Sequence, residues 1–151
     1  MTDRAPLPGP EPDWNSADSV AQALRKLESA DDEASALEAY DQFLWAVGDN
    51  HAGSFYPVVL STLAELARLL TDGGFWTQRA VMEALIDLSG SFVPQPGHEW
   101  QDGVPVQPTL QAAVQALRPQ VLRLCAGNDA RSQSAQELLE LIDDQAPPHT
   151  G

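Results

Sequence analysis

The sequence predicts an all-α protein, because apolar side chains recur at helical spacing in six segments between two proline-rich ends. Turn residues separate the six segments, and none of them shows the alternation of apolar and polar side chains that is typical of a strand. A chain of 151 residues is long enough to form one domain with its own core. We therefore expect one helical domain over residues 15–145, with disordered tails at residues 1–14 and 146–151 and with Trp14 as a possible anchor.

The first two segments form the first predicted helical pair. Ser16 is a favourable N-cap residue, and the helix after it carries Val20, Leu24 and Leu27 on one face. The second helix is expected to begin near residue 33, where three acidic residues meet the positive end of the helix dipole. Its predicted apolar stripe consists of Leu37, Tyr40, Leu44 and Val47.

The second predicted pair follows the turn that begins at Gly48. Ser54 and Pro57 are expected to start its first helix, since proline is well tolerated in a first helical turn. Leucines at helical spacing continue this helix to the turn at residues 72–74. The second helix of the pair is predicted from about residue 75 to 88, and Gly90 ends it.

The third predicted pair follows the longest irregular stretch, residues 91–107, a length that is often functional in a compact helical domain. Pro108 is expected to begin the fifth helix. Pro119 should kink that helix or divide it near Arg118. The turn at residues 127–129 then leads into the sixth helix.

The three pairs recur with a period close to 40 residues once an insertion of ~10 residues in the long loop is subtracted. Their first helices start near residues 17, 57 and 108, and their second helices start near residues 33, 75 and 129. This period is typical of HEAT-like repeats, in which each hairpin buries its apolar face against the next. The sequence thus favours three stacked antiparallel hairpins, and the alternative is a six-helix bundle without repeats.

Residues 44–90 contain a more specific pattern. His51-Ala52-Gly53 precedes Tyr56-Pro57, a leucine-rich segment follows, and Arg79 lies in the next predicted helix. This stretch resembles small bacterial HEAT-like proteins, in which a His-x-Gly turn and a Tyr-Pro helix start precede a leucine-rich helix. Such proteins often accompany polymorphic toxins and secretion-system effectors as candidate immunity proteins. The resemblance implies a helical-repeat fold and a toxin partner, and it implies no catalytic residue.

The charge of the chain narrows the class of partner. The sequence has 22 acidic and 8 basic residues, with a formal net charge of −14. Such a charge disfavours nucleic acids and anionic membranes and favours a basic protein partner. Neither a secretory signal nor an apolar run of ~20 residues is recognisable, so we expect a cytoplasmic protein without a membrane span. The alternative is export by a route that needs no such signal.

Acidic residues on the second helices are the candidate binding residues. In a stack of hairpins these helices line up, and their carboxylates would form an acidic band. The predicted band consists of Glu38, Asp41, Glu83, Asp87, Glu140 and Asp143. Trp100 in the long loop is a further candidate contact, because tryptophan is enriched in binding hot spots. The alternative is an ordinary solvated face that serves solubility.

The sequence offers little support for catalysis. Asp49, His51, His98 and Glu99 are the only plausible metal or acid–base cluster, but they lack a spaced motif such as His-Glu-x-x-His. Cys125 lies in an apolar helical run and is expected to be a packed thiol. We therefore expect neither an enzyme nor a metal or cofactor.

Together, the resemblance and the charge predict a protein-binding function. The leading hypothesis is an immunity protein that neutralises a cognate toxin by covering its basic active-site cleft with the acidic band. The alternative is a HEAT-like scaffold or adaptor without a link to a toxin. The oligomeric state stays open.

Overall fold

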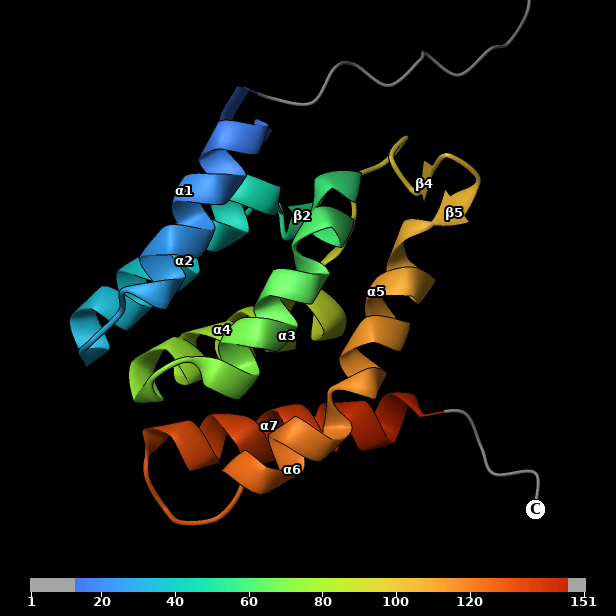
Figure 1. The fold of residues 1–151 in the computed structure, drawn as a ribbon. Helices are drawn as coiled ribbons and strands as arrows, with labels where there is room; N and C mark the ends of the chain where they lie inside the picture. Colours follow the sequence, from blue (N-terminus) through green and yellow to red (C-terminus); the bar gives the residue numbers. More distant parts are fainter. Residues whose placement is uncertain (1–12, 147–151) are drawn as a thin grey trace, which may run out of the picture.

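The computed structural model describes residues 13–146, and this part of the chain is mostly helical (Figure 1). The described residues form seven α-helices: α1 (Ala17–Glu28), α2 (Glu33–Val47), α3 (Leu63–Asp72), α4 (Phe75–Gly90), α5 (Val106–Ala116), α6 (Arg118–Leu124) and α7 (Ala130–Gln145). The prediction of one largely helical domain is confirmed. Residues 1–12 and 147–151 of the predicted tails lie outside the described residues.

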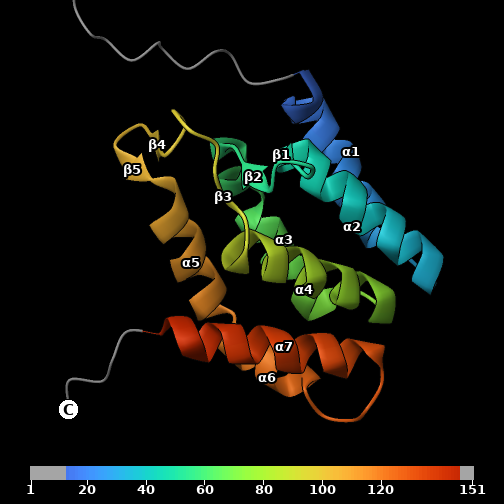
Figure 2. The ribbon, with the colours of Figure 1, turned by 180° about the vertical axis from the view of Figure 1, so that it is seen from behind.

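The helices pack as neighbours along the chain. Helix α1 packs against α2, α3 against α4, and α6 against α7. Helix α4 also packs against both α2 and α7, so that these three helices lie side by side with α4 in the middle (Figure 2). The side chains of α4 are accordingly the centre of the core, with Val81, Met82 and Leu85 fully buried.

Side-chain caps explain where several helices begin. The Ser16 hydroxyl accepts a hydrogen bond from the Ser19 amide at the start of α1 (3.1 Å). Asp32 and Ser35 form a reciprocal capping box at the start of α2. Asp129 accepts a bond from the Ser132 amide (2.8 Å) at the start of α7. The predicted starts of these three helices are confirmed.

Pro119 divides the fifth predicted helix, as its position suggested. Helix α5 ends at Ala116, and α6 begins at Arg118 with the proline in its first turn. For this reason the described part of the chain has seven α-helices, where the sequence predicts about six.

The connection between α2 and α3 differs from the prediction, which placed a helix start at Ser54 and Pro57. Ser54–Phe55 forms the short strand β2, Pro57–Thr62 forms the 3-10 helix η2, and α3 begins only at Leu63. The residue before a proline favours an extended backbone, and the Tyr56 amide donates to the carbonyl of Val47 (2.8 Å).

Short strands correct the prediction that the chain has none. Strand β2 pairs antiparallel with β1 (Gly48–Asp49) and parallel with β3 (Val93–Pro94). The hydroxyl of Ser54 donates to the side-chain oxygen of Gln95 (2.7 Å) beside this small sheet. The sheet thus ties the α2–α3 connection to the start of the long loop.

The rest of the long loop forms a hairpin rather than an irregular segment. Strands β4 (Trp100–Gln101) and β5 (Val104–Pro105) pair antiparallel across Asp102 and Gly103. Both turn residues have positive φ, 51° and 79°, as a two-residue turn of type I′ requires. Helix α5 then starts at Val106, two residues before the predicted start.

The N-terminal end of the described chain is packed as well. Residues Asp13–Asn15 form a 3-10 helix, η1, against the end of α2. The indole of Trp14 donates to the carbonyl of Gly48 (2.9 Å) and contacts Trp45 edge to face. The suggested anchor at Trp14 is confirmed. None of the helices in residues 13–146 has both the length and the apolar content that spanning a membrane requires.

Candidate protein-binding surface

The candidate surface, called here the α2–α4–α7 face, is formed by the exposed edges of three adjacent helices. It contains a cavity between α2 and α4 and a groove between α4 and α7. Between these two hollows runs the α4 ridge, defined by Arg79, Glu83 and Asp87 at successive steps of four residues.

Asp87 joins the ridge to α2. Its carboxylate accepts a hydrogen bond from the Tyr40 hydroxyl. Partial burial raises the pKa of Tyr40 well above its ordinary value, and the bond to Asp87 raises this pKa further. Tyr40 is therefore a neutral hydrogen-bond donor over the physiological pH range, and it holds Asp87 at the edge of the cavity.

Glu83 joins the ridge to α7. Its carboxylate accepts a hydrogen bond from the Ser134 hydroxyl (2.8 Å) and lies 4.0 Å from Nε of Arg79. The Arg79 guanidinium also lies over the ring of Trp76, 5.6 Å from its centroid. Two ridge side chains are thus oriented by contacts within the fold.

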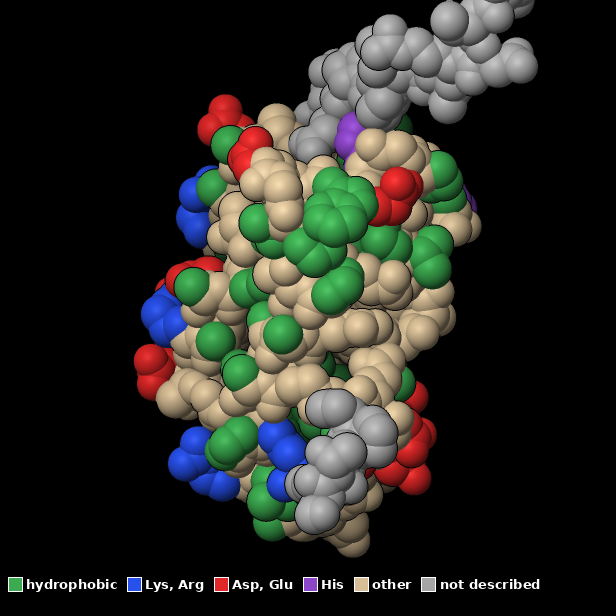
Figure 3. Space-filling model, turned by 90° about the vertical axis from the view of Figure 1, so that its right-hand side faces the viewer, with side chains coloured by type: hydrophobic (Ala, Val, Ile, Leu, Met, Phe, Trp, Pro, Cys, Tyr) green, Lys and Arg blue, Asp and Glu red, His purple; other side chains and the backbone are tan. Residues whose placement is uncertain are grey.

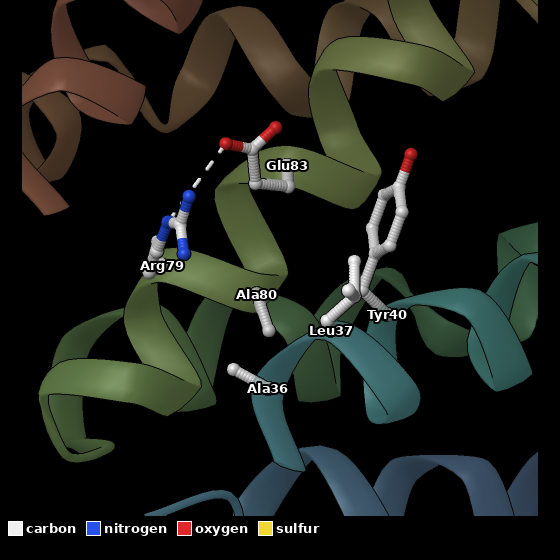
Figure 4. A pocket seen from close by; sticks show the side chains of 6 residues that line it. All are labelled: Ala36, Leu37, Tyr40, Arg79, Ala80 and Glu83. Atoms are coloured by element: carbon white, nitrogen blue, oxygen red, sulfur yellow. Dashed lines mark ion pairs between the residues drawn. The ribbon is translucent and has the colours of Figure 1, made fainter. Parts of the chain in front are cut away.

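The α2–α4 cavity has a volume of about 270 Å³. Figure 4 shows Ala36, Leu37 and Tyr40 of α2 on one side of it and Ala80 and the Arg79–Glu83 pair of α4 on the other. Its walls are thus mixed, with apolar side chains beside one cation and one carboxylate.

The α4–α7 groove is open and acidic. Carboxylates of Asp87, Glu137, Glu140 and Asp144 line it, beside the half-buried apolar side chains of Ile86 and Leu141. Among residues 13–146, no lysine, arginine or histidine forms an ion pair with any of these four carboxylates. The groove therefore concentrates negative charge that the described part of the chain does not pair.

The structure brings three of the six predicted band residues to this face: Glu83, Asp87 and Glu140. Asp41 is exposed on α2 and accepts a hydrogen bond from the Asn50 side chain (2.7 Å). It follows Tyr40 directly in the sequence, so it lies beside the cavity without lining it.

The other two predicted band residues turn away toward neighbouring helices. Glu38 pairs with Lys26 of α1 (2.6 Å), and Asp143 pairs with Arg118 of α6 (2.9 Å). Each carboxylate therefore lies at an edge where a first helix meets a second one, and each already has a cationic neighbour.

Trp100 is not gathered with these carboxylates. It lies on β4 with 64% of its surface exposed, on the β4–β5 hairpin that precedes α5. Val93 and Val104 are also exposed on this part of the chain. Figure 3 shows hydrophobic side chains gathered on the side of the molecule that carries the hairpin and α5. None of these three exposed side chains lines the cavity or the groove.

Sequence reasoning missed several residues of the face. Leu37 was expected in the buried stripe of α2, but it is 64% exposed, so that prediction is wrong. Arg79 and Glu137 were not expected at the surface site at all. Helical spacing alone does not reveal them, because it is the packing of α4 between α2 and α7 that leaves these positions open.

The candidate metal residues are dispersed. The His51 ring contacts Trp45 edge to face, and the His98 ring contacts Tyr56 in the same way. The Asp49 carboxylate accepts a bond from the Ala52 amide (3.1 Å), which supports its interpretation as a turn residue. Within residues 13–146, no group of three or more histidine, cysteine or acidic side chains is placed to hold a metal ion.

Cys125 is half-buried at the end of α6, and its thiol donates to the carbonyl of Val121 (3.4 Å). Burial raises the pKa of this thiol above its ordinary value, which disfavours the reactive thiolate.

No family model, no curated protein and no solved structure matches the chain. The structure shows a mostly helical domain with an acidic groove between α4 and α7, a cavity of about 270 Å³ between α2 and α4, and an exposed hairpin that carries Trp100.

Proposed function

We propose that the chain is a protein-binding module that docks its α2–α4–α7 face on a basic surface of another protein. The observation that carries this proposal is the α4–α7 groove, where four carboxylates lack an ion-pair partner among the described residues. Like charges held together on one surface repel one another, and a cationic partner relieves that repulsion. The same field speeds association with a basic surface, most strongly at low salt.

We further propose that the helices form three HEAT-like hairpins, α1–α2, α3–α4 and the α5/α6–α7 unit. The packing of α4 between α2 and α7 supports this arrangement, since the second helices of stacked hairpins line one surface. The face would then be the common surface of the three repeats.

The partner we propose is a cognate bacterial toxin whose active-site cleft is basic, such as a nuclease, and the chain would be its immunity protein. An enzyme that binds a polyanionic substrate presents a cationic cleft, and an acidic face that covers this cleft excludes the substrate. The resemblance of residues 44–90 to small immunity-type HEAT-like proteins supports the same assignment.

A triple variant of the groove tests the proposal. Glu137→Gln, Glu140→Gln and Asp144→Asn remove three charges from the α4–α7 groove, and Asp18→Asn, Glu33→Gln and Asp72→Asn remove three exposed charges elsewhere. We expect the wild-type chain and the control variant to capture one partner from the native lysate at low salt. We expect the groove variant to capture much less of it.

Toxicity of the captured partner then separates the two functions. A partner that kills when it is expressed alone, and is silenced by the wild-type chain but not by the groove variant, supports the immunity function. Equal capture and equal silencing by the groove variant would remove the groove from the mechanism.

The alternative function is a scaffold or adaptor. The exposed apolar side chain of Trp100 on the β4–β5 hairpin favours it, because another protein can dock there while the acidic face is occupied. A captured partner without toxicity, bound together with a second protein that is lost in a Trp100→Ala variant, would favour the scaffold.

A further inference from the structure

The α2–α4 cavity has the size of a site for one side chain. Its volume of about 270 Å³ exceeds the ~150 Å³ of a cavity that accommodates benzene. It falls below the ~300–1,000 Å³ of pockets for drug-sized ligands. One bulky apolar side chain therefore fits the space better than a cofactor or metabolite does.

The lining of the cavity suits an apolar occupant. Ala36 and Ala80 are almost fully buried at its wall, and Leu37 stands exposed at its rim. When a partner side chain covers an exposed leucine beside an open cavity, apolar surface is removed from water and the free energy of the complex falls. Hot spots of protein interfaces have this form, an aromatic or aliphatic anchor that enters a pocket.

Arg79 provides a second and independent observation. Its Nε atom is buried, and among the described residues it has no hydrogen-bond acceptor. The neighbouring Glu83 carboxylate lies 4.0 Å away, beyond hydrogen-bond distance. An unpaired buried donor costs free energy. The guanidinium lines the cavity, so a small rotation of this side chain lets it donate to a carbonyl oxygen of an entering peptide segment.

The charges around the cavity define the rest of the occupant. Glu83 lines the cavity, Asp87 holds the hydroxyl of Tyr40 at its edge, and Asp41 is exposed next to Tyr40 in the chain. Three carboxylates thus surround a cavity with one cation. Lysine or arginine residues on either side of the anchor would meet complementary charge.

We infer that the α2–α4 cavity receives one bulky apolar side chain from a basic segment of the protein partner. This inference rests on the proposed function and deepens it, because it names the chemistry of the partner segment. The anchor side chain fills the cavity under Leu37, a carbonyl of the segment accepts from Arg79, and flanking cations face Glu83 and Asp87.

Two synthetic peptides test this inference without knowledge of the partner. One is a blocked peptide with a central tryptophan flanked on each side by three lysines, and the other has alanine in place of the tryptophan. We expect the tryptophan peptide to bind the full chain about 10-fold more tightly, with chemical-shift changes at amides of α2 and α4. NMR titration of the isotope-labelled protein measures both quantities.

Two variants locate the effect. Ala80→Leu fills the cavity and should abolish the preference for tryptophan, and Leu37→Ser removes the exposed rim without touching the core. The matched controls are Ala64→Leu on α3 and Leu122→Ser on α6, both at exposed positions, which should keep the preference. If Ala80→Leu fails to fold, the Leu37→Ser variant still carries the test.

The outcomes separate this inference from the proposed function. Equal and salt-sensitive binding of the two peptides overturns the anchor site and leaves the acidic docking surface in place. A tryptophan preference that survives both Ala80→Leu and Leu37→Ser also overturns the anchor site. No binding of either peptide at low salt overturns the anchor site together with the acidic docking surface.

Discussion

Gly48 lies so close to Ser54 that its position in the fold leaves no room for a side chain. A Cβ atom on residue 48 would lie 2.7 Å from the Cα of Phe55 and closer still to the carbonyl oxygen of Ser54. This close approach lets β1 pair with β2 directly after the end of α2. Glycine is required here by space and not by its backbone angles, since its φ of −170° is extended.

Gly48→Ala should therefore destabilise the chain by ~1–3 kcal/mol, because the added methyl group forces two backbone segments apart. Urea unfolding followed by circular dichroism measures the difference. Gly74→Ala is the matched control, since a Cβ atom there meets nothing within 4 Å, and it should cost less than ~1 kcal/mol. Equal free energies of unfolding for the Gly48→Ala variant and the wild type would show that β1 and β2 can move apart without loss of stability.

Asn15 holds the end of α2 through its side-chain amide. The nitrogen donates to the carbonyls of Trp45 (2.9 Å) and Ala46 (2.7 Å) and, at longer distance, of Gly48 (3.3 Å). The Gly48 carbonyl also accepts from the Trp14 indole, and the Trp45 carbonyl also accepts from the Gly48 amide. Asn15→Ala removes the donor that the three carbonyls share and should lower the free energy of unfolding by ~1–3 kcal/mol.

The exposed Gln133 on α7 provides the control for Asn15, since Gln133→Ala should change stability by less than ~0.5 kcal/mol. Hydrogen exchange adds a local measurement: amides of the last turn of α2 should exchange faster in Asn15→Ala alone. Unchanged exchange at this turn would contradict the assigned role.

The capping box of α2 should make the stability of the folded protein depend on pH in the acidic range. The backbone amide of Ser35 and, next, its hydroxyl hold the pKa of Asp32 below its usual value. A carboxyl with a lower pKa in the folded state stabilises the fold above its unfolded pKa of ~3.9, and this contribution disappears as pH falls through the folded value. Asp32→Ser keeps a cap that does not titrate, so its stability should fall less in acid than that of the wild type.

NMR titration of the Asp32 carboxyl measures the same effect directly, and unfolding at a series of acidic pH values gives the stability curve. A folded-state pKa at or above the ordinary aspartate value would contradict the cap as its cause.

The Tyr40–Asp87 bond should be visible in alkaline solution. The chain has two tyrosines, so Tyr56→Phe leaves Tyr40 as the only titrating phenol. Because burial and Asp87 both raise the pKa of Tyr40, its ultraviolet titration should begin well above pH ~10. The stabilisation by this group is complete below its unfolded pKa and is lost as pH rises from there toward the folded value.

Asp87→Asn in the Tyr56→Phe background should move this titration toward the ordinary tyrosine range, because the neutral amide no longer adds a negative charge. An unchanged titration curve would show that burial alone sets the pKa. Tyr40→Phe should cost ~1–2 kcal/mol of stability, reduced by the partial exposure of the pair.

The helices could be predicted because their signals are local. Ser16 and Asp129 cap helices within three residues, and Pro119 ends one by its own geometry. The parallel pairing of β2 with β3 could not be predicted, since it joins residues distant in the chain, such as Ser54 and Val93. The hairpin after it did have a local signal, the dipeptide Asp102-Gly103 between two short extended segments.

The candidate surface was predictable only in part for a related reason. The helical period distinguishes a buried stripe from an exposed one, but an exposed stripe has two edges. Packing against α1 and α6 directs Glu38 and Asp143 to one edge, and packing beside α4 places Glu140 at the other. Which edge a carboxylate occupies depends on tertiary contacts that no period of the sequence encodes.

The pairing of β2 with β3 has a consequence for how the molecule can bind. The Val93 amide donates to the carbonyl of Gly53 (3.1 Å) and the Gln95 amide to that of Phe55 (2.8 Å). These bonds join the connection that follows α2 to the segment that follows α4. They should therefore restrict rotation of α2 relative to α4 at this end of the two helices. A face held in this way loses less backbone entropy when a partner docks, which lowers one of the free-energy costs of binding.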